Sequence, residues 1–162
     1  MKEVLEQLKR ANKKVLTLIL KQKYFDEILS GQKKKEYREI KPSTERKYIK
    51  FDTDGYPVED ENGNCVPIHY DYILFYVGYN TDRDAMLIEC KGATTEVILD
   101  EKGDPIFYFI NDKTKKEAFP YSYDPETGEG YDKDDNKMPD VVQYFVEQIT
   151  YDLGAIIATD IH

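Results

Sequence analysis

The stretch VLTLILKQKYFDEILSGQKKKEYREIK, residues 15–41, decides how the chain is expected to fold. It opens with a short apolar run at 15–20 that contains β-branched residues, a composition typical of a buried strand. Apolar side chains then recur at helical spacing over residues 24–29, and Gly31 can end that helix because glycine accepts a positive φ. A second strand is expected over residues 34–40. The stretch therefore predicts a strand, a helix and a second strand, with a turn glycine before the second strand.

The rest of the chain predicts mostly strands joined by acidic turns. Residues 1–14 have apolar side chains at helical spacing, as an amphipathic helix does. A short helix is expected to end near Tyr48. Further strands are expected at 72–79, 85–90, 94–99, 106–110, 143–151 and 155–159. The polar segments 52–68 and 111–140 are interpreted as insertions that carry hairpins, with at most one hairpin in the second.

Length and composition are typical of a single globular domain. The chain has 162 residues, of which 40% are hydrophobic and 13% aromatic, so it can form a core without disulfide bonds. We expect one α+β domain over residues 1–162, with a mixed β-barrel, a few flanking helices and hairpin insertions. No apolar run approaches the roughly 20 residues of a membrane helix, and the N-terminal residues are too charged for a signal peptide. These features favour a cytoplasmic protein without a membrane partner.

The cysteines and histidines form no metal-binding pattern. The chain has only Cys65, Cys90, His69 and His162 of these types, whereas a structural zinc site needs four such ligands at characteristic spacing. Two unpatterned cysteines indicate free thiols in a reducing compartment. His69 is the histidine that a catalytic site would have to use, but an ordinary polar hairpin residue is the simpler explanation. We expect no metal and no other cofactor.

Charge is distributed unevenly along the chain. The net charge is −9, yet residues 1–50 hold 15 Lys or Arg against 7 Asp or Glu, and residues 51–162 hold 8 against 25. A basic segment favours an anionic ligand such as RNA or a nucleotide. Alternatively, the basic segment pairs with the acidic remainder, and composition does not separate these two interpretations. Lysines that would extend the basic surface, or serve only solubility, are Lys13, Lys14, Lys21 and Lys23.

The turn after the predicted helix carries the pattern Gly31-x-Lys33-x-x-Glu36-x-Arg38. On a strand alternate side chains share a face, so Glu36 and Arg38 should point the same way, with Lys33 able to reach them from the turn. Arginine and lysine suit phosphate or a carbonyl-bearing base edge, and a carboxylate can accept a hydrogen bond from an amine or a hydroxyl. The alternative is a solvated lysine run beside an ordinary surface ion pair.

Aromatic residues on the predicted strands could stack on an unpaired base, as they do in proteins that bind single strands. Tyr37, Tyr76 and Tyr79 are the candidates, although tyrosines at strand spacing are more often core residues or cross-strand pairs. The predicted binding residues are Lys21, Gly31, Lys33, Glu36, Arg38 and Tyr79.

Residues 15–41 resemble the opening of an ASCH domain, a PUA-related family whose signature is G-x-K-x-x-E-x-R. All four signature positions are present, and ITYDLGAII at 149–157 is similar to the closing strand of the family. The insertions at 52–68 and 111–140 have no counterpart in it. The resemblance implies a small PUA-like β-barrel with a charged cleft beside the motif, proposed for RNA binding.

One branch of this family resembles an amidohydrolase that deacetylates acetylated cytidine nucleosides. For that activity the resemblance implies Lys33 as nucleophile or base, with Glu89 or Glu96 as the assisting glutamate. The sequence departs from the catalytic pattern, because Glu36 stands where that branch has a threonine. A carboxylate near Lys33 favours its charged, non-nucleophilic form, so binding is preferred over catalysis. A third alternative is a protein-interaction module whose acidic hairpins contact a partner.

Overall fold

The computed structural model describes residues 1–162 and divides them into two compact units. The first unit consists of Met1–Arg38, Pro67–Thr94 and Ile149–His162, and the second of Glu39–Val66 and Thr95–Gln148. Three strands contain a unit boundary: β2 (Lys35–Ile40), β4 (Ala85–Val97) and β11 (Glu147–Asp160). Whether the chain is one domain with two insertions stays a prediction.

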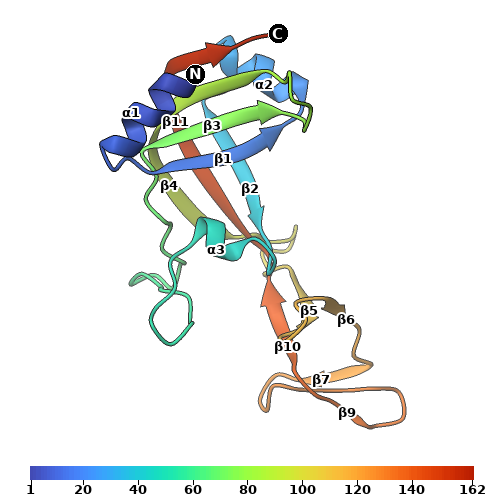
Figure 1. The fold of residues 1–162 in the computed structure, drawn as a ribbon. Helices are drawn as coiled ribbons and strands as arrows, with labels where there is room; N and C mark the ends of the chain where they lie inside the picture. Colours follow the sequence, from blue (N-terminus) through green and yellow to red (C-terminus); the bar gives the residue numbers. More distant parts are fainter. The chain divides into compact units, whose positions relative to one another are not determined.

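The first unit is built on a five-stranded sheet with strand order β1-β3-β4-β11-β2 (Figure 1). β1 (Val15–Leu20) pairs in parallel with β3 (Tyr72–Val77), which pairs antiparallel with β4. The predicted α+β class is therefore confirmed, with strands predominating. The expected closed barrel is not formed, because β1 and β2 remain at the two edges without a backbone ladder between them.

Two helices cover this sheet. α1 (Lys2–Arg10) packs its apolar stripe, including Leu5 and Leu8, against a cluster around Leu74 and Leu87 of β3 and β4. It ends before residue 14. α2 (Gln22–Leu29) buries Phe25 and Ile28. No helix is long and apolar enough to cross a membrane.

The second unit contains tight hairpins that form around an aspartate. Asp52, Asp60, Asp100 and Asp132 each accept two backbone N–H groups through Oδ1 at 2.8–3.0 Å, from the residues two and four positions later. Such bonds hold a turn without help from distant residues. The remaining elements are α3 (Glu45–Tyr48), β5 (Phe107–Asn111), β6 (Glu117–Ala118), β7 (Ser122–Asp124), β8 (Glu129–Tyr131), β9 (Lys137–Met138) and β10 (Val141–Phe145).

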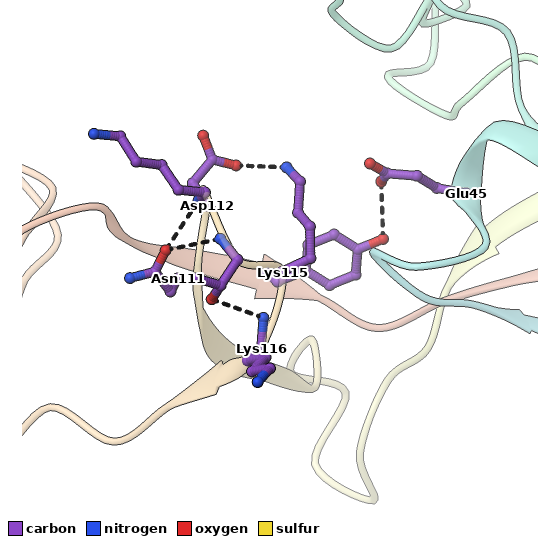
Figure 2. A network of polar contacts seen from close by, with 8 residues as sticks. Glu45, Asn111, Asp112, Lys115 and Lys116 are labelled. Carbon is purple, nitrogen blue, oxygen red and sulfur yellow. Dashed lines mark hydrogen bonds and ion pairs between the residues drawn. The ribbon is translucent and has the colours of Figure 1, made fainter.

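Asn111 has the same function at the turn between β5 and β6 (Figure 2). Its Oδ1 accepts the N–H groups of Lys113 and Thr114 at 3.0 Å, and Lys115 Nζ forms a 2.9 Å ion pair with Asp112. The segment 111–140 therefore contains β6, β7, β8 and β9, more than the single hairpin predicted. Because side-chain bonds fix each turn, strands of only two or three residues stay paired.

Two predicted strand breaks are wrong. The predicted strands 85–90 and 94–99 largely form one strand, β4, and the break expected at Leu153-Gly154 lies inside β11. Gly154 is required for a close approach rather than for a turn. A Cβ there would lie 2.8 Å from Glu89 Oε1 and 2.9 Å from Glu89 Cβ.

Replacing Gly154 with alanine is expected to lower the free energy of unfolding by about 1–3 kcal/mol, because the added methyl group overlaps Glu89. Urea denaturation measures this change. Gly92→Ala is the matched control, because a Cβ at Gly92 in β4 meets no atom within 4 Å. Equal stability of the two variants would show that the approach of Glu89 does not require a glycine.

Candidate functional site

The motif residues Lys33, Glu36 and Arg38 converge on one carboxylate. Lys33 Nζ lies 3.4 Å from Glu36 Oε1, and Arg38 Nη2 lies 3.9 Å from Glu36 Oε2. Glu36 is the one charged residue in the buried class, at 4% exposed, whereas the Lys33 and Arg38 side chains are 21% and 25% exposed. The alternation of β2 thus brings Glu36 and Arg38 to one face, and the turn at Gly31 (φ +81°) brings Lys33 to them.

The two oxygens of Glu36 differ in their partners. Oε1 accepts the Tyr37 N–H at 3.0 Å and contacts Lys33, whereas Oε2 is buried and has no hydrogen-bond partner. At 3.9 Å Arg38 supplies an opposite charge but no hydrogen bond. A buried acceptor without a donor costs roughly 1–3 kcal/mol. A ligand donor would recover this cost, but it reaches the buried Oε2 only if the surrounding side chains move.

Two contacts that the sequence did not indicate hold the cations in place. Arg38 Nη2 donates to the Ile19 carbonyl at 2.8 Å, which joins the two edge strands of the sheet. Most of the five N–H groups of Arg38 remain for a ligand. Lys33 Nζ lies 4.6 Å from the centre of the Tyr24 ring, on α2. Neither Ile19 nor Tyr24 has a local pattern that pairs it with the motif.

The other predicted binding residues lie elsewhere in the first unit. Tyr79 is 85% exposed and lines a cavity of about 630 Å³, whose lining includes Tyr76 and Arg83 but no motif residue. The Arg83 guanidinium stacks 3.7 Å from the centre of the Tyr76 ring. Lys21 is the exposed N-cap residue of α2 and has no side-chain contact with the motif. Tyr37 alternates with Glu36 on β2 and is half-exposed.

Glu89, one of the two glutamates considered for catalysis, does not contact Lys33. Glu89 Oε1 accepts the Ala155 N–H at 2.8 Å and packs against Gly154 of β11, and it forms neither a hydrogen bond nor an ion pair with Lys33. Glu96 belongs to the second unit. In this structure, Glu89 therefore supports the β4–β11 contact rather than the motif.

His69 is an exposed residue, and its Nε2 lies 3.0 Å from Asp71 Oδ1. The Lys14 N–H, which donates to Asp71, and the nearby His69 ring hold the pKa of Asp71 below its usual value. His69 and Asp71 make no hydrogen bond or ion pair with Lys33, Glu36 or Arg38.

No group of three or more His, Cys, Asp and Glu side chains within residues 1–162 is placed to hold a metal ion. Comparisons of the chain with protein-family models, with curated proteins and with solved structures found no match in any of the three. Evidence for the function of this chain therefore comes from the geometry of the motif residues.

Proposed function

We propose that the chain binds RNA or a nucleotide through Lys33, Glu36 and Arg38, as a PUA-like domain of the ASCH type. The observation that carries this proposal is the buried Glu36 carboxylate, flanked by two cations, with Oε2 lacking a donor. A nucleobase edge presents amine donors beside ring and carbonyl acceptors. Such an edge can donate to Glu36 while it accepts from Arg38.

The charge of the first unit is compatible with an anionic ligand. This unit holds 13 Lys or Arg and 11 Asp or Glu, whereas the second unit holds 10 and 21. The net charge of −9 therefore originates in the second unit, and the unit that carries the motif does not repel phosphate overall. The assignment to the PUA-like class rests on the motif and on the open mixed sheet, whose edge strands Arg38 joins.

Lys33→Ala is expected to weaken the binding of short single-stranded RNA at least about tenfold, because it removes the ammonium beside Glu36. Lys35→Ala is the matched control: it removes the same charge two residues away, from an exposed side chain paired with Asp152 at 3.2 Å. Fluorescence anisotropy at several salt concentrations measures both affinities. Equal losses for the two variants, or an affinity indifferent to salt, would contradict the proposal.

The two alternatives have less support. An amidohydrolase would need a Lys33 amine that is free to act as nucleophile or base, yet Lys33 Nζ contacts the Glu36 carboxylate at 3.4 Å and lies over the Tyr24 ring. A partner protein for the acidic hairpins stays a prediction, because no contact in the structure identifies such a partner.

A further inference from the structure

Lys33 contacts Glu36 and also lines a cavity of about 410 Å³ in the first unit. Buried apolar side chains, those of Ile28, Ile88 and Leu153, contribute to its lining, and Lys34 and Lys91 add two further ammonium groups. The Lys34 carbonyl accepts the Leu153 N–H at 3.0 Å, which ties the turn after α2 to β11. The cavity therefore brings together three lysines from two distant parts of the sequence. Its volume lies within the usual range for small-molecule sites.

Two of the three lysine charges in this cavity, those of Lys34 and Lys91, have no ion-pair partner. Its lining contains no aspartate or glutamate, and neither Lys34 nor Lys91 forms an ion pair. Asp152 pairs with Lys35. Glu89 accepts the Ala155 N–H and keeps its negative charge close to Gly154, which weakens the attraction for an anion at this point of the cavity. Lys34 and Lys91 are exposed, so an anion placed among the lysines would be attracted by charges that solvent partly screens.

Two features of the backbone affect how well an anion would bind in this cavity. The C-terminal end of α2, which carries a partial negative charge, lies at the cavity and opposes an anion. Part of that charge is neutralised, because the Gly31 and Lys33 N–H groups donate to the Ile28 and Glu27 carbonyls at 3.0 Å. Gly31 and Gly154 also line the cavity and leave it free of side chains at two points.

We propose that this cavity binds the phosphate group of a nucleotide, with Lys34 and Lys91 as its phosphate ligands. The inference rests on the proposed function, in which the base of the same nucleotide meets Glu36 and Arg38. Lys33 belongs to both sets of contacts, so it lies between the base site and the phosphate site. Lysines act as point charges towards phosphate, and this requires no fixed geometry of their side chains.

The test compares nucleosides with their 5′-monophosphates, using adenosine, cytidine, guanosine and uridine, in NMR titrations of the ¹⁵N-labelled full chain. For at least one base, the monophosphate is expected to bind about tenfold more tightly than the nucleoside. The Lys34→Gln/Lys91→Gln double variant should lose this difference and keep the affinity for the nucleoside. The amide signals of Gly31 and Gly154 should shift with the monophosphate and not with inorganic phosphate at the same low concentration.

A matched control is Lys102→Gln/Lys133→Gln, which removes two exposed lysine charges from the second unit and should keep the preference for the monophosphate. A preference that persists in the Lys34/Lys91 variant, or that is lost in the control as well, would overturn the phosphate assignment. If nucleosides bind but the phosphate adds no affinity, this inference is wrong and the proposed function survives. If no nucleoside, nucleotide or RNA binds to the unmodified chain, both are wrong.

Discussion

Arg38→Ala is expected to abolish the binding of nucleotides and RNA and to lower the free energy of unfolding by about 2–4 kcal/mol. Two groups lose their partner at once. Glu36, 4% exposed, loses one of its two flanking cations, and the Ile19 carbonyl loses the donor that joins β1 to β2. Weakened compensation of a buried carboxylate, together with a carbonyl that loses its donor, is among the few mechanisms with so large an effect. Chemical denaturation and RNA-binding titrations measure the two losses.

Two further variants separate binding from stability at this position. Arg38→Lys keeps a positive charge beside Glu36 but loses the planar fork, so it should retain most of the stability and little of the binding. The double variant Glu36→Leu/Arg38→Ala removes the buried charge together with its partner. It should be more stable than Arg38→Ala alone and still fail to bind. Unchanged RNA affinity in Arg38→Ala or Arg38→Lys would refute the proposed role of this arginine.

The local part of the site could be predicted from the sequence. Gly31 ends α2, and alternation along β2 places Glu36 and Arg38 together; both are properties of short-range backbone geometry. The same holds for the aspartate turns of the second unit, where the hydrogen bonds span only two to four residues. These features depend on residues a few positions apart, which a single sequence displays directly.

The long-range part could not be predicted. Lys91 reaches the cavity of Lys33 and Lys34 only because β4 and β11 are neighbours in the sheet, a pairing that no local pattern encodes. The contact of Arg38 with the Ile19 carbonyl likewise depends on the sheet curving enough to bring β1 within reach of an arginine side chain on β2. Tyr79 was predicted to lie at the motif, but it lines a different cavity. The sequence around an exposed tyrosine near a strand end does not indicate which cavity that tyrosine lines.

Gly154 shows why the strand boundaries were also misplaced. A glycine between two predicted strands is interpreted as a turn, because turns are the commonest reason for glycine. Here the reason lies on another strand, where the Glu89 side chain occupies the space that a Cβ would take. When a glycine is required by a neighbour 65 residues away, the residues around the glycine show no pattern that indicates the requirement.

Cys65 of the native protein is expected to react with iodoacetamide at pH 8 about a thousand times more slowly than the same thiol in the unfolded chain. Burial, followed by the hydrogen bond and the charge of Glu147, raises the pKa of Cys65 from 9.0 to about 12. Only the thiolate reacts, and at pH 8 such a shift lowers its fraction from roughly one in ten to one in ten thousand. Mass spectrometry of peptides from a time course measures the rate at each cysteine.

The pH dependence distinguishes a raised pKa from simple burial. Because the folded thiol keeps its proton to higher pH, the rate at Cys65 should rise about tenfold per pH unit from 8 to 11, whereas the unfolded thiol levels off near pH 9. Glu147→Gln removes the neighbouring charge and should accelerate the reaction at pH 8. Cys90, where burial raises the pKa of the thiol, is the internal comparison. A Cys65 rate that levels off near pH 9, unaffected by Glu147→Gln, would show that Glu147 does not control this thiol.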